Sequence, residues 1–175
     1  MKIGLGIGHC ISQQGARNIT HNITEFELNK NLCQDISEKI TDHEVVLIYR
    51  DTYVDLPEKI NLTNCDLYIE FHCNASENSK ASGSEVLYYQ WSPKGESYAN
   101  TFIKTIIESV GLPGRGIIGC NKNDRGGYVL ANTKMPAIIL EPFFIDNDSD
   151  YETFINNRDT YINNISNTIN SLVKL

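Results

Sequence analysis

The sequence of 175 residues lacks any long hydrophobic segment of the kind that spans a membrane, which needs about 18 or more consecutive apolar residues. It also lacks a cluster of basic residues, since 15 Lys and Arg stand against 22 Asp and Glu and the net charge is −7. Proteins that bind nucleic acid neutralise phosphates with such clusters. We therefore expect neither a membrane nor a nucleic-acid partner.

A disulfide framework and an export signal are absent as well. The five cysteines are odd in number and widely spaced, which favours reduced thiols. Residues 1–8 are too short and too rich in glycine for the apolar core of a signal peptide, and their pattern is that of a β-strand. We expect synthesis in the cytoplasm without export.

Short apolar strands alternate with amphipathic helices along the chain, whose 41% hydrophobic content suits a single domain with one core. The predicted strands are 2–8, 43–49, 67–72, 84–91 and 136–140, and the predicted helices are 25–40, 94–110 and 159–175, with a short helix inside 50–64. Such alternation predicts one α/β domain with a mainly parallel or mixed twisted sheet and helices on both faces. The glycine-bearing connection 111–132 is predicted to be a functional loop.

Three predicted strands end in a side chain that can do chemistry: His9, His72 and Glu141. Ligands bind beyond the carboxyl ends of strands in open α/β sheets, so we expect these residues at one edge. Two histidines and one carboxylate are a common ligand set of catalytic zinc, which leaves a fourth position for water. Either Glu141 or Glu25 is a candidate for that carboxylate.

Glu25 and Glu27 differ in their place on the predicted helix. Glu27 is three residues after Thr24, the spacing of a capping box. Glu25 is three residues before Leu28 and shares the core-facing stripe, where a carboxylate is costly unless it is paired with a cation. Glu25 is therefore the better ligand, although it would also complement the helix dipole.

Other polar residues near these positions are weaker candidates. Cys10 and Cys73 each follow a candidate histidine, and alternation along a strand predicts that they point away from the metal. His21 lies in a polar loop, and His43 begins a strand at its amino end. Glu70 shares the face of His72, where it would either orient that histidine or form a structural ion pair.

Four sequence blocks together resemble the type-3 family of zinc-dependent N-acetylmuramoyl-L-alanine amidases, in order and at comparable spacing. The blocks are Gly8-His9, Glu25 with Glu27-Leu28-Asn29, Phe71-His72-Cys73-Asn74-Ala75, and Leu140-Glu141-Pro142-Phe143. The resemblance implies that His9, Glu25 and His72 hold one Zn²⁺ per chain and that Glu141 is the catalytic carboxylate. The chain departs from the family pattern at Cys10, at Glu70, where serine is more usual, and at 142–143.

The resemblance implies hydrolysis of the amide bond between N-acetylmuramic acid and L-alanine in bacterial peptidoglycan. Without an export signal, the chain would be the catalytic domain (residues 1–175) of a phage endolysin that waits in the host cytoplasm until lysis begins. The alternative origin is a bacterial autolysin. An acidic domain has little attraction to an anionic wall, so we expect a wall-binding domain after Leu175. We expect a monomer.

Three other functions are compatible with the residues alone. A cell-wall cysteine peptidase would use Cys10 or Cys73 with a histidine and would be insensitive to chelators. A zinc carboxypeptidase acting on the stem peptide would share the metal chemistry but would cleave beside a free carboxylate. A wall-binding module without catalysis would release no product.

Overall fold

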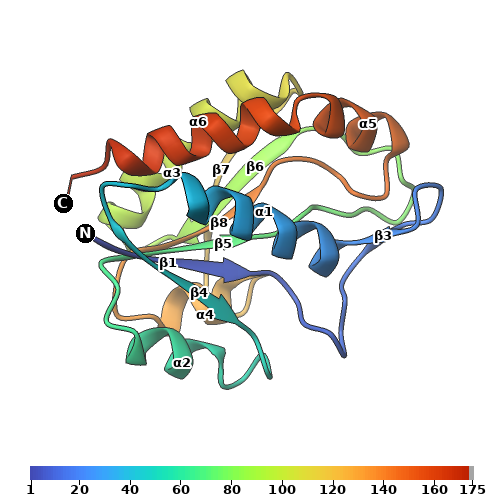
Figure 1. Cartoon of the computed structure of the whole chain (residues 1–175). Coiled ribbons are helices and arrows are strands. Elements are labelled where there is room, and N and C mark those ends of the chain that lie inside the picture. The colour runs from blue at the N-terminus through green and yellow to red at the C-terminus, as the bar shows by residue number, and fades with distance from the viewer. Residues whose placement is uncertain (174–175) are drawn as a thin grey trace.

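The computed structural model describes residues 1–173, which form a six-stranded sheet between two layers of helices (Figure 1). The strand order is β4-β1-β5-β8-β6-β7, in which all neighbours are parallel except the antiparallel pair β6 and β8. The strands are β1 (Lys2–Ile7), β4 (Glu44–Tyr49), β5 (Leu67–Phe71), β6 (Ser84–Tyr89), β7 (Gly114–Cys120) and β8 (Ala137–Glu141). The predicted single α/β domain with a mixed sheet is confirmed.

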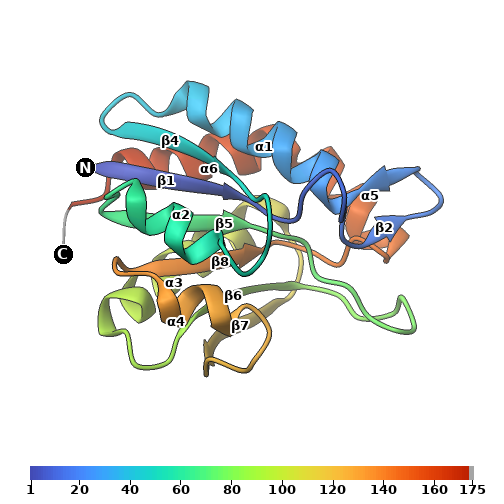
Figure 2. The same ribbon diagram turned by 90° about the horizontal axis from the view of Figure 1, so that it is seen from below.

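The helices cover both faces of the sheet, as predicted. One layer consists of α1 (Glu25–Lys39), α3 (Pro93–Val110), α5 (Asp148–Asn156) and α6 (Arg158–Asn170), and the other consists of α2 (Leu56–Leu62) and α4 (Gly127–Asn132). Seen from below, α2 and α4 lie in front of the sheet (Figure 2). No helix within residues 1–173 is long and apolar enough to cross a membrane.

The local signals for helix ends are confirmed. Thr24 caps α1, and its side chain and that of Glu27 form the reciprocal hydrogen bonds of a capping box. Pro57 stands in the first turn of α2, where its missing N–H costs nothing. Gly111 ends α3 with φ 78°, a left-handed conformation that suits glycine.

The predicted functional loop 111–132 is wrong in part, because it contains strand β7 and helix α4. Strand β7 pairs with β6 alone at the edge of the sheet and is largely exposed, so its sequence needs no apolar alternation. A small hairpin, β2 (Arg17–Asn18) with β3 (Ile23–Thr24), and helix α5 were not predicted. The predicted helix 159–175 ends at Asn170 as α6, and residues 174–175 lie outside the described part.

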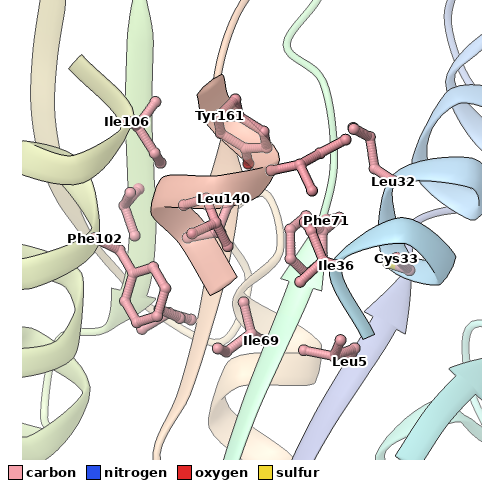
Figure 3. Close-up of a cluster of buried hydrophobic side chains, with 14 of the residues drawn as sticks. Leu5, Leu32, Cys33, Ile36, Ile69, Phe71, Phe102, Ile106, Leu140 and Tyr161 are labelled. Carbon is pink, nitrogen blue, oxygen red and sulfur yellow. The ribbon is translucent and has the colours of Figure 1, made fainter. Parts of the chain in front are cut away.

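Two apolar clusters hold the layers together and bury the central strands on both faces. The larger cluster joins β1, β5 and β8 to α1, α3 and α6 through side chains such as Leu5, Leu32, Phe71, Phe102 and Tyr161 (Figure 3). The smaller one lies under α2 and α4. Every residue of β5 is buried, as its continuous apolar run predicts. Because β1, β5 and β8 are parallel, their carboxyl ends meet at one edge of the sheet.

Candidate active site

Three side chains meet at this edge and could hold a metal ion. His9 follows β1, His72 follows β5, and Glu25 is the first residue of α1. One potential ligand atom from each side chain lies within 4.8 Å of the other two, and theirs is the one such group of His, Cys, Asp and Glu found in residues 1–173. Glu25 lies between the rings, with Oε2 3.1 Å from His9 Nε2 and Oε1 2.8 Å from His72 Nδ1.

The backbone around the cluster fixes Glu25 and leaves space for the rings. The amides of Ala16 and Cys73 donate hydrogen bonds to the two oxygens of Glu25, at 3.2 and 2.9 Å. Gly15 has φ +77°, and a Cβ atom there would lie 2.5 Å from the His9 ring. Glycine is therefore required at this position for two separate reasons.

The charges of the cluster call for a cation. Burial raises the pKa of Glu25, but hydrogen bonds and charge interactions with His72 and His9 outweigh burial and hold it well below its usual range. Burial lowers the pKa of His72, but Glu25 and Glu70 outweigh it and raise that pKa to about 10. Without a metal, a proton on His72 supplies the positive charge. Two imidazoles and a deprotonated carboxylate, closely grouped around one point, also fit the donor set of zinc.

Glu141 stands apart from this group but borders the same cavity of about 360 Å³. It ends β8, is 4% exposed, and has Oε2 3.0 Å from Nη1 of Arg125. Burial raises the pKa of Glu141 to about 7, although Arg125 and His72 act in the opposite direction. A carboxyl group with a pKa near neutrality is suited to accept and return a proton.

Sequence reasoning missed the polar network that holds Glu141. Glu85 on β6 lies directly opposite Glu141 across the antiparallel pair, and Arg125 bridges the two carboxylates. Asn74 joins the network: its Oδ1 accepts from Arg125 at 2.7 Å, and its Nδ2 donates to Glu85 at 2.7 Å. Arg115 binds the other oxygen of Glu85 at 2.8 Å. The one signal in the sequence was an acidic residue within an apolar strand.

The remaining polar candidates lie outside the three-residue group. The Cys10 thiol contacts Ser12 Oγ at 3.4 Å, and the Cys73 thiol lies 3.9 Å from Asn29 Oδ1. The prediction that Cys10 points away from the metal relied on the alternation of side chains along a strand. That reason was wrong, because β1 ends at Ile7 and the backbone at His9 is not extended, with φ +67°. The two other histidines have partners elsewhere: His21 Nε2 lies 3.6 Å from Glu152, and His43 Nδ1 lies 3.2 Å from the N-terminal amine.

Two further side chains contact the candidate ligands from the other side. Glu70 Oε1 is 3.3 Å from His72 Nε2, on the side of the ring away from Glu25. Arg50, which follows β4, has Nη2 3.4 Å from His9 Nδ1. Both residues border the cavity, so each histidine is held between Glu25 and one charged side chain.

Comparison with known proteins points to one family. The family described as N-acetylmuramoyl-L-alanine amidase matches residues 3–171. The N-acetylmuramoyl-L-alanine amidase LytC of Bacillus subtilis (strain 168) is 27% identical over 152 residues, covering 82% of this chain and 29% of LytC. The probable cell wall amidase LytH of Staphylococcus epidermidis (strain ATCC 12228 / FDA PCI 1200) is 31% identical over 161 residues, covering 89% of this chain and 52% of LytH. The curated relatives are thus considerably longer.

Solved structures of N-acetylmuramoyl-L-alanine amidases share the fold of this chain. The N-acetylmuramoyl-L-alanine amidase of Clostridium difficile 630 shares the fold with a TM-score of 0.86, at 24% identity, over 96% of this chain and 94% of that one. The catalytic domain of the CD27L endolysin, which targets C. difficile, has a TM-score of 0.78 at 28% identity, over 97% and 96%. With a family match over nearly its whole length, the chain belongs to the N-acetylmuramoyl-L-alanine amidase family.

Proposed function

We propose that this chain is a zinc-dependent amidase that hydrolyses the bond between the lactyl group of N-acetylmuramic acid and L-alanine in peptidoglycan. The observation that carries the proposal is the position of Glu141, a buried carboxylate whose pKa is raised to about 7, beside the His9–Glu25–His72 group in one cavity. Family membership supports the same bond specificity.

His9, Glu25 and His72 would hold one zinc ion, which supplies a Lewis acid that polarises the scissile carbonyl and acidifies water. Glu141 accepts the proton of the attacking water and returns it to the leaving amine of L-alanine. Arg125 holds the Glu141 carboxylate at the edge of the cavity, and Glu85 and Asn74 hold Arg125 in turn. The partner is peptidoglycan, and the cavity beside α4 is where its chain would bind.

The staphylococcal relatives are named probable cell wall amidases, which supports a role in cell-wall degradation, and one structural neighbour is an endolysin catalytic domain. We propose the endolysin role over that of a bacterial autolysin. Four features of this chain stay predictions: a phage origin, synthesis in the cytoplasm, a monomeric state and a wall-binding domain after Leu175. The thiols give the cysteine-peptidase alternative less support than the metal group gives the amidase. Burial raises the pKa of Cys73 well above its usual range. The hydrogen bond with Ser12 lowers the pKa of Cys10, but this thiol is paired with a serine and not with a histidine.

Mass spectrometry of digested peptidoglycan tests the proposal. Zinc-loaded protein should release stem peptides with a free L-alanine amine and leave intact N-acetylmuramic acid on the glycan. Removal of the metal with a chelator should abolish this product, and added zinc should restore it. Cleavage within the stem peptide, beside a free carboxylate, would support the carboxypeptidase alternative. Activity that resists chelation and is lost on thiol alkylation would support the cysteine peptidase.

A further inference from the structure

Glu70 is a buried carboxylate that the proposed reaction does not use. It is 1% exposed in the middle of the sheet, where its neighbours across the strands are Gly6 and Ile139. Its Oε2 atom is buried and has no hydrogen-bond partner within the described residues. Burying a carboxylate with so few partners costs free energy, so its position requires a compensating interaction.

The interaction that Glu70 makes is with the outer nitrogen of His72. The two carboxylates lie on opposite edges of this ring, Glu25 2.8 Å from Nδ1 and Glu70 3.3 Å from Nε2. A neutral imidazole carries one N–H and one lone pair. An acceptor beside Nε2 favours the form with its hydrogen there, which leaves the lone pair of Nδ1 directed toward Glu25 and the candidate metal position.

We infer that Glu70 is a positioning residue for zinc: it accepts the Nε2–H of His72 and thereby holds Nδ1 toward the metal. This inference rests on the zinc site proposed above. Metal-bound histidines commonly donate their second N–H to a carboxylate, and loss of such a partner typically lowers metal affinity about 10- to 100-fold. His9 has a different environment, because its outer nitrogen faces the Arg50 guanidinium instead of a carboxylate.

A purely structural ion pair would behave differently. If Glu70 served only to stabilise the fold, its replacement by an apolar residue would change the stability of the metal-free protein and leave zinc affinity unaltered. Removing one partner of a buried ion pair destabilises the fold, because the other charge is left unpaired. If Glu70 is a positioning residue, its removal should in addition lower zinc affinity, which a purely structural pair would not do.

Competition titration with a chromogenic chelator would measure the zinc Kd of the wild type, Glu70→Gln and Glu70→Leu. The Leu variant removes the acceptor and should raise Kd about 10- to 100-fold. The Gln variant keeps an acceptor oxygen but not the charge, so its Kd should lie between those of the wild type and the Leu variant. Glu85→Gln is the matched control, because Glu85 is equally buried in the same sheet but contacts no candidate ligand in residues 1–173. Its Kd should equal that of the wild type.

A second measurement reports on the ring itself and not on affinity. In ¹H–¹⁵N spectra of zinc-loaded wild type, His72 should show a protonated Nε2 whose hydrogen exchanges slowly with water. In the Gln variant, which preserves shape, this hydrogen should exchange faster. Unchanged affinity and exchange in Glu70→Gln, or an equal loss of affinity in Glu85→Gln, would overturn the inference. If the wild type itself binds no zinc, the proposed function fails as well.

Discussion

Replacing Glu141 with glutamine should abolish the proposed amidase activity while making the metal-free protein more stable at alkaline pH. The variant keeps the shape of the side chain but cannot accept a proton. Loss of a general base typically costs a factor of about 10² to 10⁴ in rate. Zinc content should be unchanged, because Glu141 lies outside the His9–Glu25–His72 group.

The stability effect follows from the pKa of Glu141, which burial raises from 4.5 to about 7. Between these pH values the unfolded chain has released the proton and the folded protein has not, so the wild type loses stability as pH rises through this window. At about 1.4 kcal/mol for each tenfold change in acidity, a rise of the Glu141 pKa from 4.5 to about 7 corresponds to at most about 3.5 kcal/mol. Glutamine does not titrate, so the stability of the Glu141→Gln variant should not fall in this way as pH rises.

Urea denaturation of metal-free protein at pH 5 and pH 8 would measure the effect, alongside peptidoglycan hydrolysis. The stability gain of Glu141→Gln over the wild type should be larger at pH 8 than at pH 5. Glu85→Gln is a control for which the expected change in stability at pH 8 has the opposite sign. Burial raises the pKa of Glu85, but Arg115 and Arg125 outweigh burial and lower it. Loss of the Glu85 charge should therefore destabilise the protein at pH 8. Near-normal turnover in Glu141→Gln, or a gain that does not grow with pH, would refute the reasoning.

Three further outcomes are expected. Arg125→Leu removes a charge that lowers the pKa of Glu141, so the acidic limb of the kcat/KM profile should shift to higher pH, and an unshifted profile would count against the network. Cys10→Ser and Cys73→Ser should each keep most of the hydrolytic activity, since both thiols lie outside the metal group; loss of hydrolysis with zinc and fold intact would revive the cysteine-peptidase hypothesis. His9→Ala and His72→Ala should each lose zinc in metal analysis, and full occupancy in either would remove that residue from the ligand set.

Local patterns in the sequence were enough to predict most elements and the residues at the edge of the sheet. The capping box at Thr24 and Glu27 predicted the start of α1 and, with it, the inward position of Glu25. The apolar run before His72 predicted a strand buried on both faces. In each case the signal lies within a few neighbouring residues, where periodicity and capping rules apply.

Contacts between distant segments could not be predicted in this way. Arg125 lies 40 residues from Glu85 and 16 from Glu141, and its pairing with them depends on the antiparallel register of β6 and β8. No local pattern indicates that register. Strand β7 was missed for a related reason, because an exposed edge strand need not show an apolar pattern. The sequence alone does not show whether Glu70 orients His72 or forms a structural ion pair, because that depends on how the His72 ring is turned in the fold.

The most direct test of the account is the zinc content of Glu25→Ala compared with Glu27→Ala. The two carboxylates are two residues apart on the same helix turn, yet Glu25 is buried between the histidines and Glu27 is exposed in the capping box. Wild type and Glu27→Ala should hold about one zinc per chain, and Glu27→Ala should lose only the helix stability that its part of the capping box supplies. Glu25→Ala should hold almost none. Full zinc occupancy in folded Glu25→Ala, or its loss in folded Glu27→Ala, would contradict the proposed metal site.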